Sequence, residues 1–128
     1  MQAITSKEIQ QLYIAYFGRP GDPSGVKYWI SCVNKKFTFR QISEALCKQD
    51  EYSILLNKNS SVDLQINQFY INLLGRKVEF DVLNTWLSLL KTDNYKISDL
   101  VCDLIIQVGT ESQENSIQGL LDHNTLKQ

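Results

Sequence analysis

The chain matches itself at a fixed offset of 57 residues, and this internal repeat constrains the fold more than any other feature of the sequence. The matched pairs are Ile9 and Ile66, Tyr13 and Tyr70, Gly18-Arg19 and Gly75-Arg76, Asp22 and Glu79, and Trp29 and Trp86. Unlike residue types that recur together at one offset indicate a duplicated supersecondary unit. The sequence therefore predicts two copies of one unit of about fifty residues.

The match continues beyond Trp86 after a one-residue insertion in the second copy. At the resulting offset of 58, Phe37-Thr38-Phe39 corresponds to Tyr95-Lys96-Ile97, and Ile42 corresponds to Leu100. A single repeat of this size cannot bury its own apolar face, so we expect the two copies to share one core. We predict one domain over residues 1–128, with repeat one at 5–57, repeat two at 61–109 and a terminal helix at 111–126.

Apolar residues three and four positions apart predict helices in both copies. In repeat one, Thr5 with Glu8 and Thr38 with Gln41 are capping-box patterns, and Asp22-Pro23 supplies an N-cap followed by a proline at the first helical position. No alternation of strand length appears. The predicted fold is all-α, a compact helical domain of about seven or eight helices.

Repeat two follows the same plan. Its second helix carries Phe80 among its apolar positions, and Gly109 is expected to end its third helix.

The most faithfully repeated element is a tyrosine, a Gly-Arg pair, an acid and a tryptophan. Gly18 and Gly75 are expected to end a helix in the left-handed conformation, where an arginine interacts favourably with the helix dipole. The acids begin the next helix and are within reach of the arginine, and the tryptophans anchor that helix onto the first. We predict structural roles for Gly18, Gly75, Arg76, Glu79 and Trp86.

A ligand site is the alternative interpretation of the first copy. Its turn has the sequence Arg19-Pro20-Gly21-Asp22-Pro23-Ser24-Gly25, whereas the second copy has Arg76-Lys77-Val78-Glu79-Phe80-Asp81-Val82. Exposed aromatic rings, arginines and carboxylates are the groups that stack on sugars and bond to them. The candidate sugar-binding residues are Tyr16, Arg19, Asp22, Tyr28 and Trp29.

Charge and hydropathy argue against several classes of partner. Thirteen basic and fourteen acidic residues give a net charge of -1, without the basic excess typical of nucleic-acid binding. No apolar run reaches the roughly 18 residues of a membrane span, and the first residues lack the pattern of a secretory signal peptide.

Catalytic and metal-binding patterns are also missing from the sequence. Cys32, Cys47 and Cys102 lie at no metal-ligand spacing and are expected to be buried free thiols. The single histidine, His123, lies among polar residues, and no phosphate loop or nucleophile-base arrangement is present. We therefore expect no enzymatic activity, no cofactor and no metal.

The segment from Ile9 to Trp29, with its Tyr, Phe-Gly-Arg, Asp-Pro, Gly and Tyr-Trp pattern, resembles the domain-of-unknown-function family 4214. The resemblance extends over about residues 5 to 126, because repeat two keeps Tyr70, Leu74-Gly75-Arg76 and Trp86. It departs at Glu79-Phe80 and Val82, where the family has Asp-Pro and glycine. The pattern is also distantly similar to the helical domain of phycobilisome linker proteins.

The resemblance implies a helical module of bacterial surface-layer and exported proteins. The leading expectation is a non-catalytic surface module that attaches to cell-envelope glycan or assembles a surface layer. The alternative is a protein-binding scaffold of the linker type. The expected partners are cell-surface polysaccharide or a protein, with self-association also open, and the expected location is the cell surface or secretion by a non-Sec route, with the cytoplasm as the alternative.

Overall fold

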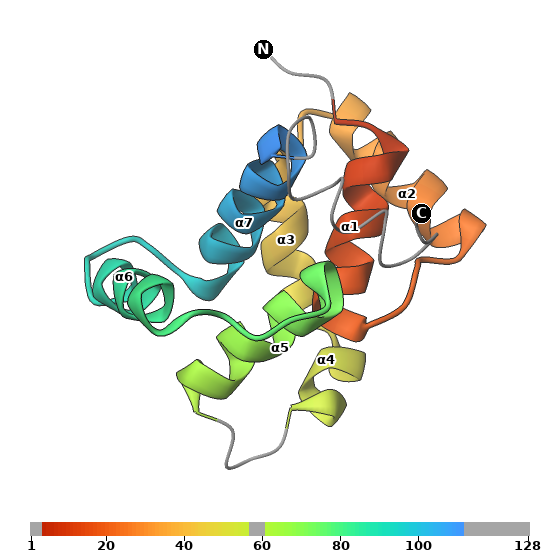
Figure 1. The fold of residues 1–128 in the computed structure, drawn as a ribbon. Helices are drawn as coiled ribbons and strands as arrows, with labels where there is room; N and C mark the ends of the chain where they lie inside the picture. The colour runs from red at the N-terminus through yellow and green to blue at the C-terminus, as the bar shows by residue number, and fades with distance from the viewer. Residues whose placement is uncertain (1–3, 57–60, 112–128) are drawn as a thin grey trace.

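The computed structural model describes residues 4–56 and 61–111, and this part of the chain contains seven α-helices and no strand (Figure 1). The helices are α1 (Ser6–Phe17), α2 (Pro23–Asn34), α3 (Phe39–Cys47), α4 (Asp50–Leu55), α5 (Val62–Leu74), α6 (Phe80–Leu90) and α7 (Ile97–Glu111). The predicted all-α fold is confirmed. The terminal helix predicted over 111–126 falls beyond α7, outside the described residues.

The helix ends have the chemistry that the sequence predicted. Gly18 and Gly75 end α1 and α5 with φ of 71° and 73°, the left-handed region that glycine adopts without steric cost. Asp22 is the N-cap of α2, and Pro23 is its first residue. At the start of α3, the Gln41 backbone N–H donates to the Thr38 hydroxyl at 3.1 Å, which completes a capping box.

Two details of repeat two differ from the expectation. Gly109 does not end α7, which continues to Glu111. A glycine within a helix costs only about 1 kcal/mol relative to alanine, so uninterrupted backbone hydrogen bonds outweigh it. Phe80 is the first residue of α6 and is 74% exposed, so it is not among the buried apolar residues of that helix.

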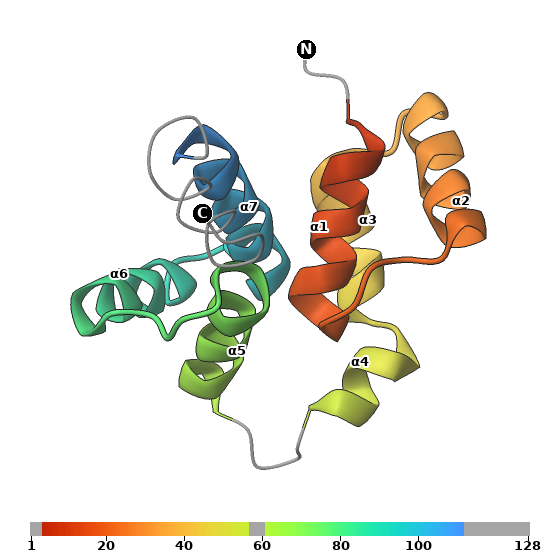
Figure 2. The ribbon, with the colours of Figure 1, turned by 45° about the vertical axis from the view of Figure 1, so that its right-hand side comes forward.

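The core lies between the two copies. Helix α1 packs against α5, and α3 packs against α7, so each pair joins one helix of repeat one to its counterpart in repeat two. Helices α2 and α6 lie on opposite outer sides of these four, as Figure 2 shows. Where α1 and α5 meet, the Asn72 side-chain amide donates to the Ala15 carbonyl at 2.9 Å, although these are equivalent positions 57 residues apart. The two repeats therefore face each other across a pseudo-two-fold arrangement.

A buried chain of hydrogen bonds joins α1, α3 and the start of α7. The hydroxyls of Tyr16 and Ser43 are 2.8 Å apart, and Ser43 donates to the Ser98 carbonyl at 2.9 Å. Burial raises the pKa of Tyr16 far above its usual value, so this phenol stays protonated. Both Tyr16 and Ser43 thus have structural partners within the core.

Ion pairs cross the exposed edge between α3 and α7. Arg40 lies 3.3 Å from Asp99 Oδ1 and 2.6 Å from Asp103 Oδ1, and the Tyr95 hydroxyl donates to Asp103 Oδ2 at 2.5 Å. Asp99 also accepts the Lys96 backbone N–H at 2.9 Å, as a cap at the start of α7. Asp99 and Asp103 are therefore part of the contact between the repeats.

The three cysteines are free, with Cys32 and Cys102 buried and Cys47 half-buried. Burial raises the pKa of the Cys102 thiol to about 12, which keeps it protonated and unreactive at neutral pH. Within the described ranges, no helix has the length and apolar character needed to cross a membrane.

Candidate functional site

The two tryptophans of the repeated motif are buried and hydrogen-bonded in the same way. The Trp29 indole N–H donates to the Tyr13 hydroxyl at 3.0 Å, and the Trp86 indole N–H donates to the Tyr70 hydroxyl at 2.8 Å. Both rings are less than a tenth exposed. Because a buried indole needs an acceptor for its N–H, the first and last residues of the motif form one packing unit. This contact explains why their spacing is the same in both copies.

The glycines of the first turn make room for the Tyr13 ring. A Cβ added at Gly21 would lie 2.5 Å from Tyr13 Cδ2, and a Cβ at Gly25 would lie 2.7 Å from its hydroxyl oxygen. Both distances are far below van der Waals contact. The Pro-Gly-Asp-Pro-Ser-Gly sequence, which marked this turn as a candidate ligand loop, therefore has a packing explanation.

A second contact recurs in both copies, and the sequence did not reveal it. The Gly21 backbone N–H donates to the Gln10 side chain at 2.6 Å, and the Val78 backbone N–H donates to the Asn67 side chain at 3.1 Å. Each amide lies 11 residues before the turn that it holds. Gln10 and Asn67 are equivalent positions at offset 57. Because one is a glutamine and the other is an asparagine, comparing the two copies by residue type did not identify them as a matched pair.

Arg19 forms an ion pair with another residue of the same chain. Its guanidinium forms a bidentate pair with Glu51 of α4, with Nη2 2.7 Å from Oε1 and Nε 2.9 Å from Oε2. The guanidinium also lies over the Tyr13 and Phe17 rings, at 5.7 and 5.6 Å from their centroids. The pair with Glu51 raises the pKa of Arg19 further above its usual value. Arg19 thus joins α4 to the end of α1. The sequence suggested Asp22 as its ion-pair partner, but the partner in the structure is Glu51.

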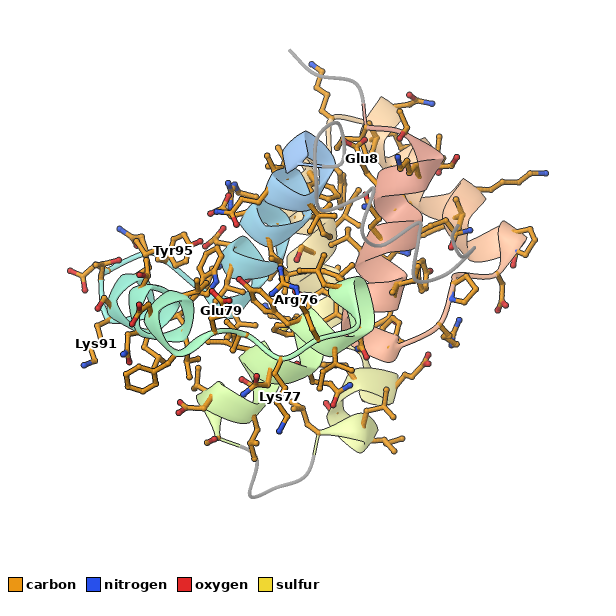
Figure 3. All side chains as sticks on the ribbon, viewed as in Figure 1. Glu8, Arg76, Lys77, Glu79, Lys91 and Tyr95 are labelled. Atoms are coloured by element: carbon orange, nitrogen blue, oxygen red, sulfur yellow. The ribbon has the colours of Figure 1, made fainter. Side chains whose placement is uncertain are left out.

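Arg76, the counterpart of Arg19, has a different environment. None of the ion pairs between described residues includes Arg76. At offset 58 the position of Glu51 is taken by Gly109, which has no carboxylate. Figure 3 shows Arg76 and Glu79 on the side of the α5–α6 connection that faces α7, while Lys77 points away from it.

The five residues predicted to bind sugar do not form one exposed surface. Tyr16 is 2% exposed and Trp29 is 7% exposed, so the prediction that their rings are available for stacking is wrong. Both lie on the apolar faces of their helices, where helical periodicity directs them to the core. Arg19 is paired with Glu51, and only Tyr28 and Asp22 are exposed.

A cleft of about 680 Å³ lies between α1, α4 and α5. The rings of Tyr16, Tyr52 and Phe69 pack together at its base, with Tyr52 and Phe69 stacked at 6.3 Å between centroids. Its walls include Leu55 and Leu64, each 58% exposed, and Ile71, 41% exposed.

Sequence reasoning missed this cleft. Leu55 and Leu64 belong to different repeats and meet only because α1 packs against α5. The sequence feature that could have indicated the cleft is the number of apolar residues on α4 and α5, which exceeds the number needed for one buried face.

Two smaller hollows lie beside α7. One, of about 150 Å³, is lined by Tyr70, Leu74, Arg76, Glu79, Val82, Leu104, Gln107 and Val108. The other, of about 550 Å³, lies between α6 and α7 and includes Leu89 and Ile106. The two adjoin, because Val82 and Gln107 line both.

Within the described residues, no group of three histidine, cysteine or acidic side chains is placed to hold a metal ion. The single histidine, His123, lies outside those residues. Burial raises the pKa of the Tyr52 phenol at the base of the cleft, so it is a neutral hydrogen-bonding group there.

No family model, curated protein or solved structure matches the chain. The resemblance to family 4214 therefore stays a prediction.

Proposed function

We propose that the protein is a non-catalytic protein-binding module, and that the cleft between α1, α4 and α5 takes an apolar helix of a partner protein. The observation that carries the proposal is the exposure of Leu55, Leu64 and Ile71 around a cleft of about 680 Å³. Apolar side chains exposed together around a concave surface are typical of sites that bind a partner. This function corresponds to the scaffold alternative from the sequence.

The chemistry of the cleft favours a peptide over a sugar. Its base is aromatic, and amide side chains on α5, Gln65, Gln68 and Asn72, lie along its lining. This pattern of apolar anchoring positions with a few polar groups is that of grooves that bind an amphipathic helix. Among the described residues that line the cleft, Lys77 is the one cation, so the described lining offers little charge for recognition.

Attachment to envelope glycan is less well supported. It requires stacking surfaces, and two of the three predicted aromatic rings are buried. Tyr28 remains exposed, with its ring packed edge-on against Trp29 at 4.9 Å between centroids. One exposed ring beside Asp22 is a smaller surface than a polysaccharide site of the predicted kind would use.

Affinity capture from a lysate of the source organism, with a matched pair of variants, tests the proposal. Leu55→Glu places a charge in the cleft wall, whereas Ile54→Glu places one at the neighbouring position, which is 80% exposed and outside the cleft lining. We expect the wild type and Ile54→Glu to retain the same proteins and Leu55→Glu to lose them.

Equal retention by both variants would contradict the proposed site. Binding to a glycan array or to purified lipopolysaccharide that is lost in Tyr28→Ala would instead support the envelope-attachment hypothesis.

A further inference from the structure

Helix α5 carries a row of three exposed residues that line the cleft. Leu64, Gln68 and Ile71 are four and three positions apart, so they follow one face of the helix. Other residues of α5, such as Ile66 and Phe69, are buried in the core. The core therefore uses a different face of α5 from the one that carries this row.

The exposed leucine of the row is specific to repeat two. At the offset of 57, Leu64 corresponds to Lys7 of α1, which is exposed and charged. Gln68 and Ile71 correspond to Gln11 and Ile14, which have the same residue types but are half-buried. The second copy thus has an exposed apolar side chain where the first has a cation, and apolar side chains exposed together are typical of a binding surface.

The row has the order that a two-fold contact with itself requires. Leu64 lies about 6 Å before Gln68 along the helix axis, and Ile71 lies about 4.5 Å after it. When two α5 helices cross antiparallel with the two-fold axis at Gln68, Leu64 of each copy meets Ile71 of the other. An isologous interface of this kind pairs one surface patch with the same patch of a second copy.

The polar group at the centre of the row is complementary to itself. The Gln68 side-chain amide donates to Asn72 Oδ1 at 2.8 Å, which uses one of its two N–H groups. A glutamine side chain also has a carbonyl oxygen that accepts hydrogen bonds. Two Gln68 amides that face each other across the axis can therefore each donate to the other.

The charges at the ends of α5 are also complementary in this arrangement. Asp63 lies in the first turn of α5 and Lys77 lies just beyond its last residue. None of the ion pairs between described residues includes either of them. An antiparallel crossing brings Asp63 of each copy to the end of α5 that carries Lys77 of the other, so the symmetry creates this contact twice.

We propose that the helix bound at the cleft is α5 of a second copy of this chain, in an antiparallel two-fold dimer centred on Gln68. This inference rests on the proposed function, because it names the partner helix at the same cleft. The row occupies a single helix face, which is a small surface for a protein interface. We therefore expect a reversible dimer whose population depends on concentration.

Sedimentation velocity of the full chain over a range of concentrations tests the dimer. Gln68→Glu places two carboxylates opposite each other at the axis, so we expect it to raise the dissociation constant of the dimer by about tenfold. Gln11→Glu, the same change at the counterpart position of α1, is the matched control and should leave this constant unchanged. A wild-type chain that stays monomeric at every concentration would overturn the proposal, as would equal effects of the two variants.

A charge exchange tests the antiparallel arrangement. Asp63→Lys and Lys77→Asp should each weaken the dimer, because each places like charges together at both ends of the contact. An equimolar mixture of the two variants should dimerise again, because every contact in the mixed dimer pairs a lysine with an aspartate. A mixture that dimerises no better than either variant alone would overturn the antiparallel dimer.

Failure of the dimer and failure of the proposed function give different results. A monomeric chain that retains another protein from the lysate, and loses it in Leu55→Glu, overturns the dimer and leaves the proposed function in place. Equal retention by Leu55→Glu and Ile54→Glu, together with a dimer that Leu55→Glu does not weaken, contradicts the cleft as the binding site and with it the dimer proposed here.

Discussion

Three side-chain and backbone features recur in both copies at the same spacing: the tryptophan–tyrosine hydrogen bond, the amide that holds the turn, and the left-handed glycine. The first of these has the clearest energetic meaning, because donor and acceptor are both buried. A buried indole N–H without an acceptor carries the full cost of its desolvation. The motif is therefore maintained by the cost of leaving one member unpaired as well as by the area that the rings bury.

Tyr13→Phe and Tyr70→Phe test this interpretation of the motif. Each removes the hydroxyl that accepts the indole N–H of Trp29 or Trp86 and leaves a buried donor unpaired. We expect each to lower the free energy of unfolding by about 1–3 kcal/mol in urea denaturation.

Tyr28→Phe is the control, because the Tyr28 ring is 59% exposed, and it should change this free energy by less than about 0.5 kcal/mol. If the buried and exposed substitutions had equal effects, the hydrogen bond would not be what maintains the motif.

The residues that could be predicted are those with strong local preferences. Gly18 and Gly75 need a left-handed backbone, Pro23 needs the first turn of a helix, and Trp29 needs a large buried contact. The Arg19–Glu51 pair was not predictable, because its members are 32 residues apart and meet only after α4 folds back on α1. Asp22, nearer in sequence, was the natural partner to expect.

At the scale of helices, the contact between α3 and α7 combines apolar burial inside with charge at the edge. Lys96 donates to Glu44 Oε2 at 3.0 Å, and Lys48 lies 3.3 Å from the same oxygen. These two lysines hold the pKa of Glu44 below its usual value near 4.5. The charges therefore join the start of α7 to the middle of α3.

The shifted carboxyl predicts a pH dependence. Because the pKa of Glu44 is lower in the folded chain than in the unfolded chain, its ion pairs stabilise the fold above the unfolded pKa. This stabilisation is lost as the pH falls through the folded pKa. In an NMR titration we expect the Glu44 side-chain carboxyl to titrate below pH 4.5, with Lys96→Gln moving the midpoint upward. A midpoint unaffected by Lys96→Gln would show that the contact does not form in solution.

The sequence predicted that the helices form more accurately than it predicted where they end. Apolar periodicity and caps identified α1 to α7, since both signals are local. The continuation of α7 through Gly109 was missed, because a glycine ends a helix only where the next residues turn away, and this depends on packing. The cleft was missed for a related reason, since Leu55 and Leu64 become neighbours only through the packing of α1 against α5.

At the scale of the whole molecule, the two copies form one hydrophobic core rather than two. The residues of the core cluster come from both repeats, and the largest contacts between helices pair a helix with its counterpart. Separation of the repeats would expose the apolar faces of α1, α3, α5 and α7 together. We therefore expect neither repeat to be stable without the other.

The most direct measurement of this claim uses the tryptophans as one reporter per repeat. Trp86→Phe leaves only Trp29 in repeat one, and Trp29→Phe leaves only Trp86 in repeat two. In each variant, urea unfolding followed by tryptophan fluorescence and by far-UV circular dichroism should give the same midpoint, because a shared core unfolds in one cooperative transition. Separate midpoints for the fluorescence of one repeat and the helix signal of the whole chain would contradict the shared core.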